Sequence, residues 1–198
     1  YGFVYCFTNS IIDTGISKPD NYSKESVDDV LNTLNASTYT TDTGVRPNII
    51  FIQLESFFDV DMVKDLELSK DAIPNFHKLQ KSFSNGFLTV PTVGAGTVNT
   101  EFEMLTGMSQ RDFGTSEYPY KTILRKTAAE SICYDLKQLG YASHCVHNNE
   151  GTFYGRNKVF KNLGFDTFAS MEYMNGLEDN PNGWKKDRVL TGEILKTL

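Results

Sequence analysis

A threonine that follows a glycine-rich turn is the first candidate for chemistry in this chain. The stretch Gly94–Gly107 reads GAGTVNTEFEMLTG, and from Thr97 onward it becomes helix-like. Its apolar residues recur at helical spacing, at Val98, Phe102 and Leu105. A hydroxyl in the first turn of a helix lies among unpaired backbone N–H groups, which stabilise an anion or a developing oxyanion. Thr97 is therefore a candidate nucleophile, and the alternative is a simple N-cap whose oxygen accepts an N–H of the first turn.

A carboxylate follows the first strongly apolar run. Residues 48–54 (NIIFIQL) have the pattern of a strand buried on both faces of a parallel sheet, and Glu55 comes directly after them. Open α/β sheets place their sites at the carboxyl ends of strands. A carboxylate and a hydroxyl at one place favour a divalent metal, which lowers the pKa of the hydroxyl. The alternative is that Glu55 is a surface residue opening the next loop.

Three further polar side chains follow a strand predicted at 141–146. His147 comes first, and Tyr154 and Arg156 follow a short way along the chain. A guanidinium offers a planar fork of donors for a phosphate or sulfate oxygen, and His147 offers a second donor. The alternatives are a loop histidine and a surface arginine, which are the commoner situations for these residue types.

These residues are positioned by alternating strands and helices. Strands are predicted at 48–54, 87–91 and 141–146, and helices at 23–34, 74–84, 97–107, 127–139, 158–163 and 187–198. This alternation, without an internal repeat, predicts an α/β fold with a doubly wound, mainly parallel sheet flanked by helices. His77 falls on the polar side of its helix, where we expect it to be solvated.

The chain divides into two parts at a Thr-rich connector. Residues 1–45 are predicted to be an arm, whose helix at 23–34 carries one apolar stripe that needs a surface to pack on. Residues 46–198 are predicted to form one α/β domain. Because the sequence does not begin with Met and ends abruptly, we expect it to be a piece of a longer protein.

Composition excludes some partners. The net charge is -6 and no basic run is present, which argues against a nucleic acid partner. No stretch approaches the roughly 18 consecutive apolar residues of a membrane span. The three cysteines, Cys6, Cys133 and Cys145, are too few for a disulfide framework, so we expect free thiols, with a Cys133–Cys145 bridge as the alternative.

The motifs taken together resemble the lipoteichoic acid synthase family. The resemblance rests on 48–56 (NIIFIQLES), on Gly96-Thr97 with Glu101-Phe102 after it, and on 147–157 (HNNEGTFYGRN). Members of this family are phosphoglycerol transferases of the sulfatase and alkaline phosphatase superfamily. Residues 18–23 (KPDNYS) resemble the linker that follows the family's membrane helices. The resemblance therefore implies that residues 46–198 are the N-terminal portion of an extracellular, sulfatase-like catalytic domain. This domain would lie on the outer face of a Gram-positive-type cell membrane, tethered in the full-length protein.

The resemblance also assigns roles to residues. Glu55 would be a metal ligand, and Thr97 would be both nucleophile and ligand, with Mn²⁺ as the implied ion and Mg²⁺ or Zn²⁺ as alternatives. His147, Tyr154 and Arg156 would hold the glycerol phosphate headgroup. The implied partners are an anionic phospholipid of the phosphatidylglycerol type and a polyglycerol phosphate acceptor.

Two departures from the family pattern bear on this assignment. Tyr154 stands where the lipoteichoic acid synthases usually have Trp, which leaves the headgroup open. The chain has three histidines and no Asp-His pair, although the family completes its metal site with such a pair and a further His. We therefore expect this chain to hold a metal weakly and to show little turnover. The alternative functions are phosphoethanolamine transfer, hydrolysis of sulfuric or phosphoric esters, and non-catalytic binding of anionic glycolipid.

Overall fold

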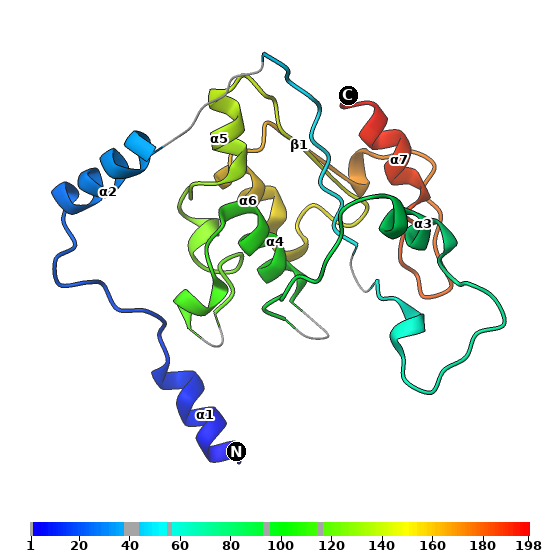
Figure 1. Ribbon diagram of the computed structural model, residues 1–198, viewed down its shortest axis with the longest axis horizontal. Coiled ribbons are helices and arrows are strands. Elements are labelled where there is room, and N and C mark those ends of the chain that lie inside the picture. Colours follow the sequence, from blue (N-terminus) through cyan, green and yellow to red (C-terminus); the bar gives the residue numbers. More distant parts are fainter. Residues whose placement is uncertain (1, 38–43, 55–56, 93–95, 115–116) are drawn as a thin grey trace.

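The structure is a computed structural model that describes residues 2–37, 44–54, 57–92, 96–114 and 117–198. A central body contains helices grouped beside a pair of strands, and the two N-terminal helices project away from it (Figure 1). The helices are α1 (Phe3–Ile12), α2 (Lys24–Ser37), α3 (Pro74–Ser82), α4 (Thr97–Thr106), α5 (Ile132–Gln138), α6 (Arg156–Asn162) and α7 (Arg188–Leu195). The strands are β1 (His144–His147) and β2 (Thr167–Ser170).

The two strands are parallel neighbours joined through α6. In their register His144 lies opposite Thr167, and His147 lies opposite Ser170. This is a strand–helix–strand unit, and such a unit directs the carboxyl ends of both strands to the same edge. The predicted α/β class with parallel strands flanked by helices is confirmed.

The buried core joins α4 to α6. Its fully buried members come from α4, from the 119–125 segment and from α6: Val98, Phe102, Tyr120, Leu124, Val159, Phe160 and Leu163. Phe160 stands edge-on to Tyr120 and to Phe168 of β2, with ring centroids 6.3 and 4.9 Å apart. Each large apolar side chain buried in this way contributes about 1.5–3 kcal/mol. This packing holds the helix that begins at Thr97 against the helix that begins at Arg156.

The helix predictions follow the structure closely where local signals were strong. The helices predicted at 74–84 and 97–107 form as α3 and α4, and Gly107 caps α4 in the left-handed conformation. The helix predicted at 127–139 begins only at Ile132 because Ser131 caps it, accepting the N–H of Cys133 at 3.2 Å.

Two of the three strand predictions are wrong. Residues 48–54 and 87–91 form no strand, and the apolar side chains of both runs are largely exposed, with Phe87 93% accessible. The predicted strand at 141–146 does form, starting at His144, while β2 carried no sequence signal that we recognised. A strand requires a ladder partner as well as an apolar pattern, and no described residue supplies one for 48–54 or 87–91.

The N-terminal segment contacts the body through the turn at residues 15–16. The N–H of Ile16 donates to the carbonyl of Asp112 at 3.0 Å. The apolar stripe of α2, which we expected to be docked, is 41–59% exposed at Val27, Val30, Leu31 and Leu34. Among the described helices, none combines the length and apolarity that crossing a membrane requires.

The cysteines are free thiols, as predicted. Cys133 is buried within α5, Cys145 is half-buried in β1, and Cys6 is exposed on α1. The alternative of a Cys133–Cys145 bridge is therefore wrong for this structure.

Acid should weaken the fold through Asp166. Its carboxylate accepts hydrogen bonds from the Lys137 ammonium and from the Ser143 N–H at 2.9 Å, and these lower the pKa of Asp166 to about 2. A depressed carboxyl pKa stabilises the fold above the unfolded value near 4, and this stabilisation is lost as pH falls toward 2. We expect Asp166→Asn to be less stable than wild type at pH 7 and equally stable near pH 2, as measured by urea unfolding. Asp20→Asn, at an exposed position, is the control, and a constant difference across this pH range would contradict the prediction.

Candidate functional site

Thr97 is the first residue of α4. Gly96 is the N-cap, with φ 84°, and its carbonyl accepts the N–H of Asn99 at 2.9 Å. The alternative that Thr97 is itself the N-cap is therefore wrong by one position. Thr97 is half-buried in the first helical turn, where the N–H groups of the helix end are not used by the helix itself. Such a position stabilises negative charge on a bound group.

The left-handed conformation of Gly96 sets the direction in which α4 begins. A Cβ at Gly96 would lie 3.0 Å from the Tyr118 hydroxyl and 3.2 Å from the methyl group of Thr92. The backbone at Gly96 therefore lies so close to Tyr118 that any side chain there would be in tight contact with the ring.

Substitution of this glycine should disturb the start of α4. We expect Gly96→Ala to cost at least about 1–2 kcal/mol of folding free energy, because the left-handed backbone alone costs an L-residue that much. Thermal unfolding measures this cost. Gly86→Ala is the control, since a Cβ there meets nothing within 4 Å and φ is not left-handed. Equal stability of the two variants would contradict the strain argument.

Arg156 is buried at the first position of α6 and faces α4. Its side chain is 2% exposed and forms an ion pair with Glu101. The Nε group donates to Oε2 of Glu101 at 3.2 Å, and Nη2 donates to Oε1. The alternative that Arg156 is a surface cation is therefore wrong. Glu101 lies one helical turn after Thr97, so this pair ties the turn that precedes α6 to the helix of the candidate nucleophile.

The turn before α6 is held in an unusual backbone conformation. Tyr154 has φ 58° and Gly155 has φ 72°, which places two consecutive residues in the left-handed region. A non-glycine residue there is uncommon and persists when its surroundings over-determine it. The Tyr154 ring packs edge-on to Phe153 at 4.6 Å, and the guanidinium carbon of Arg156 lies 5.4 Å from the centre of the Tyr154 ring.

A lysine links this turn to the start of α4. The Lys121 ammonium lies 4.5 Å from the centre of the Tyr118 ring and 5.6 Å from that of Tyr154. Tyr118 in turn contacts Gly96, as described above. Lys121 is exposed, so its charge is available to an anion that approaches this side of the molecule.

His147 is the last residue of β1 rather than the first residue of a loop. It is half-buried and lies opposite Ser170 in the strand register. The chain then runs from the carboxyl end of β1 to Tyr154 and Arg156. The structure therefore brings the Tyr154–Arg156 turn to α4, and it places His147 at the strand end that leads into this turn.

Two neutral groups surround the Glu101–Arg156 pair. Burial raises the pKa of the Tyr120 phenol well above its usual value, and the negative charge of Glu101 raises it further. Burial likewise raises the pKa of the Cys145 thiol to about 12, with Glu101 raising and Arg156 lowering it. Both groups are therefore protonated at neutral pH, and neither competes with Glu101 for the guanidinium as an anion.

Glu55 lies outside the described residues. Of the proposed Glu55–Thr97 metal pair, the structure therefore describes Thr97 alone. Among the described residues, one group of three His, Cys, Asp or Glu side chains lies close enough together to hold a metal ion. It consists of Asp59, Asp61 and His77, whose ligand atoms lie within 4.8 Å of one another. Thr97 does not belong to this group. The described residues at Thr97 therefore do not complete a metal site.

His77 joins a loop to the start of α3 instead of facing solvent freely, which corrects the prediction of a solvated side chain. Its Nε2 lies 3.0 Å from Asp59 Oδ2, and its Nδ1 lies 2.9 Å from Asp71 Oδ2. The hydrogen bonds to Asp71 and Asp59 raise the pKa of His77 and lower those of both carboxyls. Phe57 stacks edge-on against Phe76 at 4.8 Å, so aromatic packing supports the same connection.

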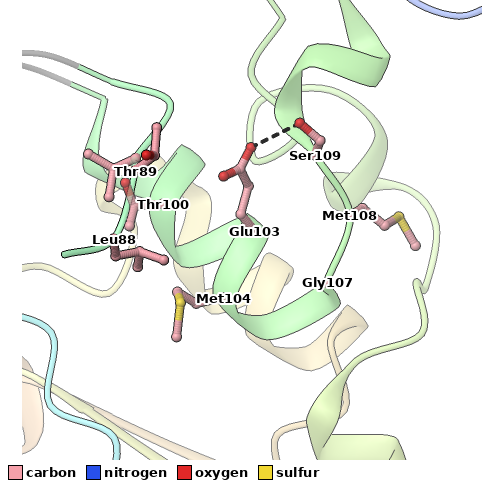
Figure 2. Close-up of a pocket in the computed structure, with 9 residues that line it drawn as sticks. Leu88, Thr89, Thr100, Glu103, Met104, Gly107, Met108 and Ser109 are labelled. Atoms are coloured by element: carbon pink, nitrogen blue, oxygen red, sulfur yellow. Dashed lines mark hydrogen bonds between the residues drawn. The ribbon is translucent and has the colours of Figure 1, made fainter. Parts of the chain in front are cut away.

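A shallow groove lies beside α4, between it and the 88–90 segment (Figure 2). Its volume is about 270 Å³, and its lining includes Leu88, Thr100, Met104 and Met108. Glu103 is turned toward Ser109, whose hydroxyl donates to it at 3.3 Å. None of the predicted site residues lines this groove.

Three residues of this region had no site role in the sequence analysis, namely Glu101, which appeared only as part of a motif, Tyr118 and Lys121. Glu101 had a recognisable signal, because a residue four positions after Thr97 lies on the same helix face. Tyr118 and Lys121 had none, because their proximity to Gly96 and Tyr154 depends on how the 117–125 segment folds back.

Comparison with known proteins identifies the family to which the chain belongs. The family described as Sulfatase matches residues 47–198. A Rhizobium meliloti protein named for cyclic beta-1,2-glucan modification is 30% identical over 196 residues, which is 98% of this chain and 29% of that protein. The lipoteichoic acid synthase of Staphylococcus saprophyticus is 29% identical over 68% of this chain and 21% of its own length.

A solved structure has the same fold. The Streptococcus pyogenes phosphoglycerol transferase GacH, in complex with sn-glycerol-1-phosphate, superposes with a TM-score of 0.69 at 23% identity. The match covers 93% of this chain and 50% of that one. The chain thus spans at most half the length of these three proteins. Since the family match extends over more than half of the chain, the protein belongs to the sulfatase family.

Proposed function

We propose that this chain is part of a metal-dependent phosphoglycerol transferase that acts on a lipid of the phosphatidylglycerol type. The observation that carries the proposal is the ion pair between the buried Arg156 and the partly buried Glu101. This pair holds the turn that carries Tyr154 and Arg156, two of the predicted headgroup residues, against Glu101. Glu101 lies one helical turn after Thr97. A nucleophile at a helix N-terminus and an arginine on the adjoining helix are two elements that support transfer of a phosphorus-containing group.

The proposed reaction has two steps. The Thr97 hydroxyl loses its proton as its oxygen attacks the phosphorus of the lipid and forms a new P–O bond. The P–O bond to diacylglycerol breaks, and a proton passes to the diacylglycerol oxygen. Thr97 then carries the phosphoglycerol group as an ester. A glycerol hydroxyl at the end of a polyglycerol phosphate chain attacks the same phosphorus, loses its proton, and returns Thr97 to its free hydroxyl form.

The remaining site residues have supporting roles in this proposal. Arg156, His147 and Tyr154 hold the glycerol phosphate headgroup, with the two basic side chains donating to its oxygens. Lys121 adds positive charge beside Tyr154. The α4 N-terminus stabilises the additional negative charge on phosphorus during transfer.

The cofactor in this proposal is a divalent cation held by Glu55 and Thr97, with Mn²⁺ ahead of Mg²⁺ and Zn²⁺. When bound, such an ion lowers the pKa of a ligating hydroxyl. The described residues at Thr97 do not by themselves complete a site for this ion. The proposed location is the outer face of a Gram-positive-type cell membrane, where the lipid donor is found.

A second candidate differs in the acceptor. The relative matched over 98% of this chain is named for cyclic beta-1,2-glucan modification. The same intermediate on Thr97 could pass its phosphoglycerol group to a hydroxyl of a glucan, since the second step requires only an acceptor hydroxyl. The donor half of the reaction is identical in the two candidates.

Mass spectrometry of the complete gene product tests the donor half. After incubation with phosphatidylglycerol and Mn²⁺, we expect a phosphoglycerol adduct on the peptide that contains Thr97. Addition of polyglycerol phosphate or of cyclic glucan should then discharge the adduct, and the acceptor that discharges it distinguishes the candidates. An adduct on another residue, or none with any lipid, would contradict the proposal.

A further inference from the structure

The contact between Glu101 and Arg156 has features that packing alone does not require. A buried ion pair is costly to desolvate, and replacing it by apolar residues is often neutral or stabilising. Nothing in the core cluster around α4 and α6 calls for a charge, because its members are apolar or neutral at pH 7. The pair is therefore a candidate for a functional role rather than a requirement of the core.

The geometry of the pair controls the direction of the guanidinium. Two of its donor groups, Nε and Nη2, face the two carboxylate oxygens of Glu101. A guanidinium is planar, so two contacts to one carboxylate fix both its position and the orientation of its plane. The rings of Phe153 and Tyr154 lie 5.8 and 5.4 Å from its central carbon and limit its movement further.

The position of Glu101 on α4 connects this orientation to Thr97. Both residues belong to one rigid helix and are four positions apart, on one face. Any shift of Arg156 relative to Glu101 therefore shifts it relative to Thr97 as well. A displacement of about 1 Å at a reacting group is enough to cost on the order of 10²-fold in rate.

We infer that Glu101 is a positioning residue, whose carboxylate orients the Arg156 guanidinium toward the phosphate group of a ligand at the N-terminus of α4. This inference rests on the proposed function for the identity of the ligand. It gives Glu101 no contact with the reacting atoms. It also makes the pair electrically neutral, so that Arg156 contributes directed hydrogen bonding while net positive charge comes from Lys121.

Arginine side-chain NMR tests the orientation without any ligand. In the complete gene product, we expect a slowly exchanging Nε–H signal that disappears in Arg156→Lys and is thereby assigned. In Glu101→Gln this signal should exchange faster and shift, because the neutral amide is a poorer acceptor for the guanidinium. Glu103→Gln is the matched control on the same helix, and its amide oxygen can still accept the Gln110 N–H that Glu103 accepts at 2.8 Å. An unchanged Arg156 signal in Glu101→Gln would overturn the inference.

Calorimetry with sn-glycerol phosphate tests the consequence for binding. We expect Glu101→Gln to weaken binding about tenfold, which corresponds to about 1.4 kcal/mol, and Glu103→Gln to bind as wild type does. A role in packing alone would lower the melting temperature of Glu101→Gln and leave its affinity, measured well below that temperature, unchanged. That result would overturn the inference, even if Arg156→Lys bound glycerol phosphate more weakly than wild type.

The two arms separate this inference from the proposed function. If wild type binds no glycerol phosphate while the Arg156 signal depends on Glu101, the orienting role is supported and the proposed ligand is wrong. If wild type binds glycerol phosphate and Glu101→Gln behaves as wild type in both arms, the proposed function stands and the positioning role is wrong.

Discussion

Replacement of Thr97 by Ala should reduce phosphoglycerol transfer by about 10⁴-fold or more, since loss of a covalent nucleophile typically has effects of this order. The substitution removes the oxygen that accepts the group from the lipid, and no described hydroxyl occupies the same position at the start of α4. The fold should be nearly unaffected, because Thr97 is half-buried and Gly96 is the N-cap.

The measurement is release of diacylglycerol from phosphatidylglycerol by the complete gene product. Thr97→Ser, which keeps the hydroxyl, should fall far less. Thr106→Ala is the control at the other end of the helix, where the hydroxyl donates to the Phe102 carbonyl at 2.7 Å. Comparable activity of Thr97→Ala and Thr106→Ala would remove Thr97 from the chemistry, whatever the two variants did to stability.

Replacement of Arg156 by Ala should have the largest effect on stability. It leaves the Glu101 carboxylate, only 16% exposed, without its guanidinium partner. Removal of one member of a buried ion pair typically costs about 3–5 kcal/mol, because the remaining charge stays desolvated. Binding of glycerol phosphate should be lost at the same time, since the proposed headgroup donor is gone.

Urea unfolding and calorimetry together check this result. Arg188→Ala is the matched control, since its side chain is 70% exposed and pairs with Glu178 at 3.1 Å, and exposed pairs contribute about 0–1 kcal/mol. If Arg156→Ala does not fold, Arg156→Lys keeps the charge and loses the planar fork, and it should fold with weakened binding. Equal stability of the Arg156 and Arg188 variants would contradict the buried-pair account.

Several features of this protein could be predicted from the sequence because they depend on neighbouring residues. The helix that starts at Thr97 follows from a glycine, a 3.6-residue apolar period and a glycine cap, all within Gly94–Gly107. The helix at α3 follows in the same way from Pro74 and its apolar face. The motifs that carry the family resemblance are likewise short stretches of sequence, and the sulfatase family match bears them out.

The features that were missed depend on partners far away in the chain. The apolar run at 48–54 has the composition of a buried strand, yet a strand exists only where a neighbouring ladder accepts it, and the described pairing joins β1 to β2 instead. His77 was expected to be solvated, but the fold carries it to Asp59, 18 positions earlier in the chain.

The candidate site shows the same division. The sequence alone determined which residue types are present and that Thr97 stands at a helix start. Only the tertiary structure decided that Arg156 is buried and that it faces Glu101, 55 positions away. The reason is that a guanidinium becomes buried only when packing of α4 against α6 excludes water and supplies a carboxylate at the same place, and neither condition is encoded within any single stretch of the chain.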